Sequence, residues 1–307
     1  MNNQNDWYIF NHIESLNKIS ASYANADIFV DLISILYSGG SETDTFQTKY
    51  GSYGLKGVDT FTISDFSERG VYIGSTIKNC KIIDVENIIK PIDLADYLNF
   101  TMLPLIKENR VPIFIGGDHS ITYGILSILN NLKVCNALIW FDAHLDVSSY
   151  RKKTMHNGSV LKYIVDNKLI DENKIVILGY REQDEETIDF LRNFKGLAIS
   201  SNEISKIGLK KLKDRISMYI DQKDKVYWSL DIDVLEPSLA PGTTYRMPGG
   251  LTVRELFNIV YLLKDYAPVA ADIVEYNPSN DFQNITASII LRYITQLTEI
   301  IIIKNKK

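Results

Sequence analysis

The sequence predicts an α/β fold in three layers, α/β/α, with a mostly parallel central sheet of about eight strands. Two observations predict it. Short runs rich in β-branched residues recur along the chain, and segments with the 3.6-residue period of helices lie between many of them. The predicted strands are apolar nearly throughout, which is typical of a parallel sheet that helices cover on both faces.

The predicted strands are 28–37, 71–75, 111–117, 137–143, 174–180, 196–200, 226–234 and 269–277. The clearest helical periods are at 120–132, 159–170 and 252–266. Stretch 38–57 is rich in Gly, Ser and Thr and predicts a long loop after the first strand. The apolar stretch 285–303 is interrupted by Arg292 and Glu299, which favours a helix in the core or a subunit contact over a membrane span.

The composition indicates one globular domain over residues 1–307. The 307 residues are 45% hydrophobic, and no linker or internal repeat divides them. The formal net charge is −5 and the basic residues are scattered, so we expect a small-molecule partner and no nucleic acid or membrane. The first residues lack the pattern of a secretory signal, so we expect a cytoplasmic protein.

Polar clusters follow four of the predicted strands. They are GGDHS (116–120), DAHLD (142–146), DIDV (231–234) and EYNPSND (275–281). Ligands of open parallel sheets bind beyond the carboxyl ends of the strands, so these clusters are expected at one edge. Asp142, His144 and Asp146 alternate and share one face, and carboxylates so close repel each other unless a cation lies between them. The pattern therefore predicts a metal site.

Together with SLDIDVLEPSLAPG (229–242) and VEYNP (274–278), these segments resemble the signature segments of the ureohydrolase family, the arginases and agmatinases. The resemblance implies an arginase-like fold, a binuclear manganese centre with two Mn²⁺ per chain, and hydrolysis of a guanidino group to urea and an amine. It also implies a homo-oligomer, a trimer or a hexamer.

The resemblance assigns six metal ligands. One manganese would be bound by His119, Asp142, Asp146 and Asp231, and the other by Asp142, His144, Asp231 and Asp233. Asp142 and Asp231 would bridge the ions and so take part in catalysis. Carboxylates with a minority of imidazoles suit Mn²⁺, and the motifs contain no thiolate. Two such ions lower the pKa of a shared water, which can then attack the guanidinium carbon.

Two further catalytic residues are predicted. Glu275 matches the guanidinium-binding glutamate of the family and would hold the substrate by charged hydrogen bonds. His156 lies where agmatinases carry a histidine and is predicted to move protons or contact substrate. The alternative for His156 is a loop histidine that bonds only to backbone.

The substrate is predicted from the stretch after Asp146. In arginases this stretch is rich in Asn and Thr and holds the α-amino acid group, whereas here it is VSSYRKKT (147–154). Agmatine, which gives putrescine and urea, is therefore favoured. The acidic run 182–186 either attracts its amine or is the solvated start of a helix. The alternatives are arginase, guanidinobutyrase or formiminoglutamase, and a substrate carboxylate would pair with the basic residues Arg151, Lys152 and Lys153.

One departure from the family bears on the site, and two alternatives bear on its class. The loop GTTYRMPGG (242–250) differs from the GTGTP type that is common in the family. A non-catalytic metal-binding protein is a remote alternative, but it would have no need of Glu275. A one-zinc amide hydrolase of the histone deacetylase type is another, and the second ligand set, with His144 and Asp233, argues against it.

Overall fold

The structure is a computed structural model. It describes residues 28–41, 48–55, 58, 69, 71, 73, 76–85, 90–102, 106–107, 109–149, 154–182 and 184–306. Arg151, Lys152 and Lys153 lie outside these residues. The described part of the predicted loop 38–57 includes two short helices, η2 (Thr48–Tyr50) and α2 (Gly51–Gly54).

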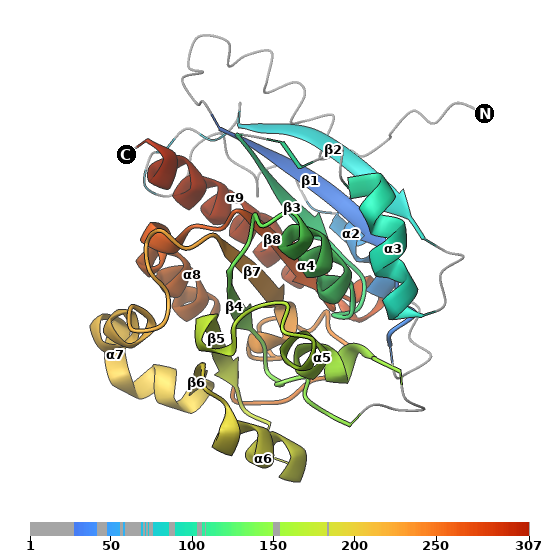
Figure 1. The fold of residues 1–307 in the computed structure, drawn as a ribbon. Coiled ribbons are helices and arrows are strands. Elements are labelled where there is room, and N and C mark those ends of the chain that lie inside the picture. Colours follow the sequence, from blue (N-terminus) through green and yellow to red (C-terminus); the bar gives the residue numbers. More distant parts are fainter. Residues whose placement is uncertain are drawn as a thin grey trace, which may run out of the picture.

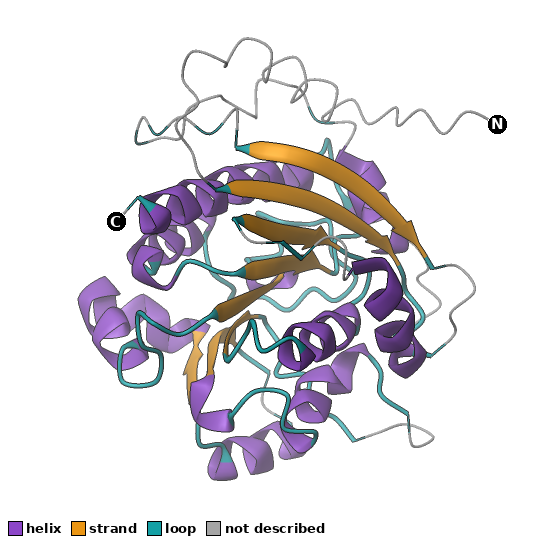
Figure 2. Cartoon of the chain, turned by 45° about the horizontal axis from the view of Figure 1, so that its top comes forward, coloured by secondary structure: helices purple, strands orange, loops and turns teal. Residues whose placement is uncertain are grey.

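In the described part of the chain, the core is one sheet of eight strands, all paired in parallel (Figures 1 and 2). The order across the sheet is β2-β1-β3-β8-β7-β4-β5-β6. This confirms the predicted fold class. The strands are β1 (Phe29–Leu36), β2 (Ile77–Asp84), β3 (Arg110–Ile115), β4 (Ala137–Phe141), β5 (Ile175–Tyr180), β6 (Leu197–Ser200), β7 (Val226–Asp231) and β8 (Ala270–Val274).

The second strand lies later in the chain than its prediction. The run 71–75 was expected to form it, but β2 is Ile77–Asp84, and the described residues Val71 and Ile73 belong to no strand. β2 is at the edge of the sheet and pairs only with β1. Within β2, the polar residues Lys78, Asn79 and Lys81 interrupt the apolar ones, so the strand lacks the continuous apolar run of the central strands.

Helices cover both faces of the sheet. One hydrophobic cluster packs four helices against one face, and the other cluster packs three helices against the opposite face (Figure 1). The first set is α3 (Pro91–Met102), α4 (Ile121–Asn131), α5 (Val160–Asp166) and α6 (Glu185–Asn193). The second set is α7 (Ser201–Ile216), α8 (Val253–Leu262) and α9 (Ile285–Asn305). Short 3-10 helices lie between them: η6 (Asn157–Ser159), η7 (Glu172–Lys174), η8 (Ile232–Val234), η9 (Lys264–Tyr266) and η10 (Pro278–Asn280).

Local signals fix where several helices begin. Asp184 accepts a hydrogen bond from the backbone of Thr187 at the start of α6, inside the acidic run 182–186. Thr252 and Glu255 form a reciprocal capping box at the start of α8. Each cap satisfies backbone N–H groups that have no partner inside the helix.

Helix α9 is the predicted apolar C-terminal segment. It is long and apolar enough to cross a membrane, but 83% of its most apolar window is buried in this fold. The fully buried Glu299 pairs with Arg69, whose Nη1 lies 3.3 Å from Glu299 Oε2. The guanidinium of Arg69 also stacks on the ring of Tyr261 of α8. These contacts are those of a core helix with a paired buried charge.

The strand order brings the predicted motifs together. β3, β8, β7 and β4 are the four central strands, and GGDHS, EYNP, DIDV and DAHLD follow their carboxyl ends. Although these segments are separated by up to about 160 residues of sequence, they lie side by side at one edge of the sheet. The sheet therefore assembles the candidate site from its centre.

Candidate metal centre

The end of β4 provides the carboxylate at the middle of the site. Asp142 is fully buried, and its Oδ2 accepts a hydrogen bond from Nε1 of Trp140, 3.0 Å away. Its Oδ1 accepts one from the backbone N–H of His144 at 2.7 Å. These two donors fix the plane of the carboxylate, which leaves its remaining lone pairs directed at neighbouring side chains.

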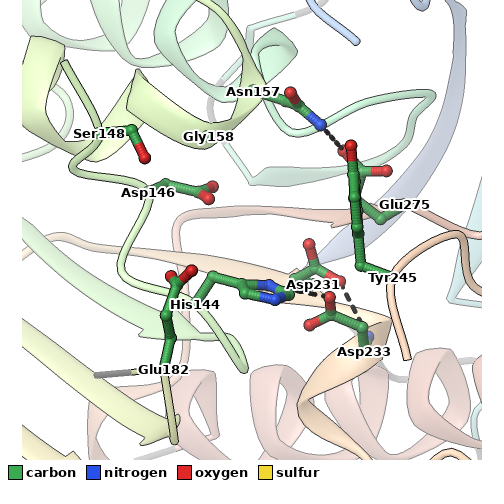
Figure 3. A pocket seen from close by; sticks show the side chains of 10 residues that line it. All are labelled: His144, Asp146, Ser148, Asn157, Gly158, Glu182, Asp231, Asp233, Tyr245 and Glu275. Carbon is green, nitrogen blue, oxygen red and sulfur yellow. Dashed lines mark hydrogen bonds and ion pairs between the residues drawn. The ribbon is translucent and has the colours of Figure 1, made fainter. Parts of the chain in front are cut away.

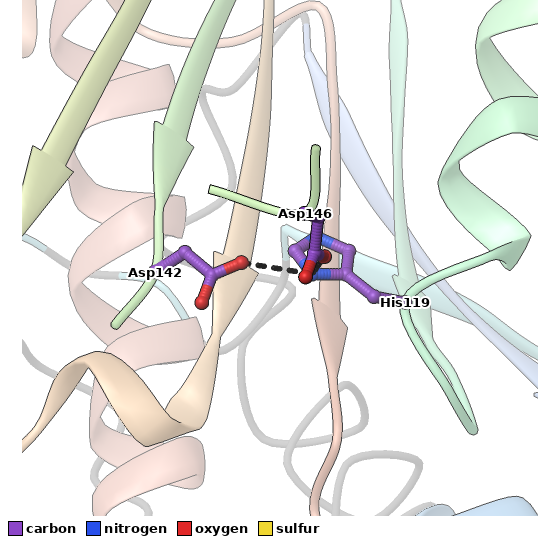
Figure 4. Close-up of side chains that lie close together, drawn as sticks. All are labelled: His119, Asp142 and Asp146. Carbon is purple, nitrogen blue, oxygen red and sulfur yellow. Dashed lines mark ion pairs between the residues drawn. The ribbon is translucent and has the colours of Figure 1, made fainter. Parts of the chain in front are cut away.

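A first cluster forms around His119. Its Nδ1 lies 3.1 Å from Asp146 Oδ2, 3.2 Å from Asp142 Oδ2 and 3.4 Å from Asp231 Oδ2. Figure 4 shows His119, which follows β3, together with Asp142 and Asp146, which follow β4. Asp146 has a left-handed backbone, with φ at 53°, which turns its carboxylate back towards His119.

A second cluster forms around His144. Its Nδ1 lies 3.1 Å from Asp233 Oδ2 and 3.5 Å from Asp142 Oδ1. Asp142 thus faces both imidazoles, one with each oxygen, and is common to both clusters. Asp231 Oδ1 accepts a hydrogen bond from the backbone of Asp233, which ties the two aspartates of the β7 end together. The structure therefore brings all six predicted ligands together.

The carboxylates strongly perturb one another. Burial, followed by the charges of Asp233 and Asp142, raises the pKa of the Asp231 carboxyl well above its usual range. Burial and the charge of Asp142 raise the pKa of Asp146 to about 7. Burial alone would lower the pKa of His119, but the surrounding carboxylates raise it well above its usual value. So much buried negative charge requires positive charge beside it.

The donor set fits a pair of hard divalent cations. Each cluster offers one imidazole nitrogen and carboxylate oxygens within 4.8 Å of one another, and no thiol belongs to either. Oxygen donors with a minority of imidazole suit Mn²⁺ and related ions, whereas thiolates favour zinc. The two groups share Asp142, so two ions bound here would lie next to each other.

A buried network supports His119 from behind. Its Nε2 lies 2.8 Å from Ser229 Oγ, which donates to Asp272 Oδ1 at 2.6 Å. Asp272 is fully buried and also accepts hydrogen bonds from the hydroxyls of Thr122 and Tyr227. The register places Ser229 of β7 directly beside Asp272 of β8. This contact to Nε2 fixes the imidazole so that Nδ1 faces the carboxylates.

Glu275 begins the segment after β8. Its backbone is left-handed, with φ at 60°, and its N–H donates to the carbonyl oxygen of Gly117 at 2.8 Å. Oε1 accepts hydrogen bonds from the backbone N–H of His119 and from Nδ2 of Asn157, both at 3.0 Å. Burial and the charge of Asp118 raise the pKa of this carboxyl to about 8. Glu275 is thus held beside the metal ligands on the side of β3.

A small cavity opens onto these residues. Its volume is about 130 Å³, well below the roughly 300–1,000 Å³ of pockets for drug-sized ligands. Figure 3 shows its walls. It is lined by His144, Asp146, Ser148, Asn157, Gly158, Glu182, Asp231, Asp233, Tyr245 and Glu275.

The predicted catalytic His156 is buried next to this cavity but is not one of its lining residues. Its Nε2 lies 3.2 Å from the carbonyl oxygen of Ser149. The neighbouring Asn157 lines the cavity instead and contacts Glu275. Asn157 belongs to none of the four motifs, and its only signal in the sequence is its place beside His156.

Two other lining residues belong to segments that the sequence suggested lie near the substrate, the acidic run 182–186 and the loop 242–250, although no single residue in them was predicted to line the site. Of the described residues in the acidic run 182–186, only Glu182 lines the cavity, and burial raises its pKa. Tyr245 belongs to the loop 242–250, whose sequence differs from the family pattern. Its ring contacts the His144 ring edge-on, with 6.1 Å between the ring centroids. Arg181 fixes this loop, because its guanidinium donates to the carbonyl oxygens of Met247 and Asp233.

Comparisons with known proteins identify the family. The arginase family model matches residues 59–298. Arginase from Staphylococcus aureus (strain MRSA252) is 32% identical over 222 residues, which cover 66% of this chain and 72% of that protein. Proclavaminate amidinohydrolase from Streptomyces clavuligerus is 32% identical over 186 residues, or 60% of this chain and 59% of that protein.

The fold is also that of solved structures. The crystal structure of formimidoylglutamase from Bacillus subtilis subsp. subtilis str. 168 is similar with a TM-score of 0.80 and 24% identity, over 91% of this chain and 89% of that one. The chain belongs to the arginase family and is a hydrolase that acts on carbon–nitrogen bonds.

Proposed function

We propose that the protein is a binuclear manganese amidinohydrolase that cleaves a guanidino group to urea and an amine. The observation that carries this proposal is that two imidazole–carboxylate clusters share Asp142 beside a small cavity. One ion would be held by His119, Asp142, Asp146 and Asp231, and the other by Asp142, His144, Asp231 and Asp233. A mononuclear hydrolase would need only one of these clusters.

The side chains of the chain have distinct tasks in this reaction. When bound, the metal pair supplies an activated water near neutral pH. Glu275, fixed through Oε1, would hold the planar guanidinium with Oε2 and orient its carbon towards the clusters. Asp142 and Asp231 keep the site negative and position the imidazoles. A proton-shuttle role for His156 stays a prediction, since its ring meets the backbone of Ser149.

We propose agmatine as the substrate. Among the described residues that line the cavity, the ionisable side chains are carboxylic acids, a tyrosine and one histidine, and none is a lysine or arginine. A substrate carboxylate would therefore lose its water without finding a charged partner there, which costs at least about 1–3 kcal/mol. An amine at the far end would instead meet the partly buried Glu182.

A substrate that bears a carboxylate is the second candidate. The relatives include an arginase and a proclavaminate amidinohydrolase, and both of these names refer to compounds with a carboxylate. Arg151, Lys152 and Lys153 follow the pocket residue Ser148 closely in the sequence, so a basic rim would favour such substrates. Arginase, guanidinobutyrase and formiminoglutamase activities fall under this candidate.

Product release distinguishes the two candidates. Metal-free protein is reloaded with Mn²⁺, and separately with Ni²⁺, and urea is measured with agmatine, arginine, guanidinobutyrate and guanidine; formamide is measured with formiminoglutamate. Agmatine should give the highest kcat/KM with Mn²⁺, by roughly a hundredfold over arginine. If arginine is faster than agmatine under matched conditions, the arginase assignment replaces agmatinase. One metal per chain by elemental analysis would contradict the binuclear centre.

The trimer or hexamer that the family resemblance implies, and the cytoplasmic location, stay predictions. Light scattering of the purified chain tests the first, and fractionation of cells tests the second.

A further inference from the structure

Asp118 is a carboxylate that the proposed reaction does not use. It belongs to the GGDHS segment after β3, directly before His119, and it is fully buried. It belongs to neither of the two imidazole–carboxylate clusters found among the described residues, and it does not line the cavity. A buried carboxyl group needs hydrogen-bond donors around it, so its role depends on the groups that its two oxygens contact.

Three donors surround this carboxyl group. Oδ1 accepts hydrogen bonds from the backbone N–H of Ser120, at 2.9 Å, and from the hydroxyl of the same residue. Oδ2 accepts one from the backbone N–H of Gly40, at 2.9 Å. Gly40 lies 78 residues earlier in the chain, in the segment after β1. Asp118 therefore ties the segment after β1 to the segment after β3.

Gly40 connects this tie to Glu275. Its carbonyl oxygen accepts a hydrogen bond from the backbone N–H of Asn157 at 2.9 Å. Asn157 in turn donates from Nδ2 to Oε1 of Glu275 at 3.0 Å, the bond drawn as a dashed line in Figure 3. The same Oε1 accepts the backbone N–H of His119, the residue after Asp118, at 3.0 Å. These contacts close a ring from Asp118 through Gly40, Asn157, Glu275 and His119.

The backbone packs closely around this ring. The backbone N–H of Asp118 donates to the carbonyl oxygen of Tyr37 at 3.2 Å, and a Cβ at Gly117 would lie 1.5 Å from that oxygen. The carbonyl oxygen of Gly117 accepts the backbone N–H of Glu275 at 2.8 Å. The segment after β3 is thus held between the segments that follow β1 and β8, its two neighbours in the sheet.

We infer that Asp118 is a positioning residue for Glu275, the side chain proposed to hold the guanidinium head of the substrate. The inference rests on the proposed amidinohydrolase function. Asp118 acts through Gly40 and Asn157, whose amide fixes Oε1 of Glu275 and leaves Oε2 for the substrate. A carboxylate that two donors already hold loses little rotational freedom when the substrate binds, so the site is oriented in advance.

Asp118→Asn breaks the ring at its first bond. The amide oxygen can accept from both donors of Ser120, and the NH₂ group then faces the backbone N–H of Gly40, where two donors meet. We expect this variant to lose roughly 10- to 100-fold in kcat/KM for the guanidino substrate that the wild type prefers. Its metal content, measured by elemental analysis, should equal that of the wild type.

Gly40→Ala breaks the same bond without changing the carboxyl group. The new Cβ would lie 2.2 Å from Ser120 Oγ and 2.8 Å from Asp118 Oδ1, so the segment must move away and a similar loss is expected. Ser120→Ala is the matched control, because it removes one donor from Oδ1 and leaves the bond to Gly40 in place. It should stay within about threefold of wild type in kcat/KM. A control as impaired as Asp118→Asn would overturn the inference.

A double-mutant cycle with Asn157→Ala separates positioning from a general structural role. If Asp118 acts through Asn157, the double variant should lose about as much kcat/KM as the more impaired single variant. Losses that multiply would overturn the inference, because Asp118 would then act by a route that does not include Asn157. Loss of metal from Asp118→Asn would also overturn it, since the residue would then support its neighbour His119. Thermal melting confirms that each variant is folded.

Binding and crystallography separate this inference from the proposed function. Calorimetry with guanidinium chloride on the metal-loaded protein should give a Kd roughly 10- to 100-fold weaker for Asp118→Asn than for the wild type, and equal values would refute the inference. If the wild type neither hydrolyses nor binds guanidino compounds, the proposed function fails, and crystal structures decide the role of Asp118. In Asp118→Asn the contact between Asn157 Nδ2 and Glu275 Oε1 should be lost, whereas an unchanged contact would refute the positioning role.

Discussion

Replacing Glu275 by glutamine removes the carboxyl group that would ionise beside a cationic substrate, without removing the hydrogen bonds that hold the side chain. Oε1 of Glu275 accepts from the N–H of His119 and from Nδ2 of Asn157. The amide oxygen of a glutamine can accept both, so we expect the fold and the metal content to be retained. Those two donors also fix the orientation of the new amide. Its NH₂ group must then point into the cavity, where a donor replaces the acceptor Oε2.

The expected loss follows from this geometry. Glu275 is 6% exposed, so its contact with a cationic head is made in a site with little water. Removing one partner of a buried, hydrogen-bonded charge pair costs about 2–5 kcal/mol, or roughly 30- to 5,000-fold in kcat/KM. The inward-facing NH₂ group repels the N–H groups of the substrate, which favours the upper half of that range.

The assay is product release over the panel of guanidino compounds, with melting temperature and metal content measured in parallel. All substrates should lose activity by a similar factor, because Glu275 acts on the head that they share. A loss below tenfold with fold and metals intact would refute the reasoning. A loss confined to one substrate would also refute it, since that would place Glu275 at the variable end of the ligand.

Three further substitutions test residues that hold the candidate site in place. Ser229→Ala removes the 2.8 Å contact to Nε2 of His119 and should weaken metal binding by about 10- to 100-fold in calorimetric titration; an unchanged isotherm would contradict the supporting network. Asp231→Asn removes charge shared by both ions and should abolish urea release while the melting temperature stays near that of wild type, whereas normal turnover would exclude this residue from the centre. Gly117→Ala would place a Cβ 1.5 Å from the carbonyl oxygen of Tyr37, so denaturant unfolding should show a loss of more than about 3 kcal/mol. Wild-type stability of that variant would mean that the backbone can move aside.

The central strands and the residues of the two imidazole–carboxylate clusters could be predicted because both follow local patterns. β3, β4 and β7 are buried almost throughout and are mostly apolar in sequence, and the proposed ligands lie where those runs end. β2 was misplaced because an edge strand is not uniformly apolar. The carboxylate of Asp272 inside β8 is explained by the hydroxyls of Ser229, Tyr227 and Thr122, which lie between 43 and 150 residues earlier in the sequence.

The walls of the cavity could not be predicted in the same way. Asn157 reaches Glu275 because its backbone is tied to Gly40, over a hundred residues earlier in the chain. Tyr245 faces His144 because its loop is held in place by Arg181, which donates a hydrogen bond to the carbonyl oxygen of Met247 in that loop. These contacts are set by tertiary structure, so no spacing within either segment encodes them.

The strand order has a consequence for how the protein is made. β8 inserts between β3 and β7, yet it is the last strand to leave the ribosome. Until Ala270–Val274 emerges, the nascent chain can form only two separate half-sheets, β2-β1-β3 and β7-β4-β5-β6, each with an open edge. The two halves hold different ligands, with His119 on one and Asp142, His144 and Asp231 on the other. Capture of the ion proposed to bind His119 would therefore be a late event in biogenesis, and until β8 pairs, the exposed edges of β3 and β7 are open to chaperones and to misassembly.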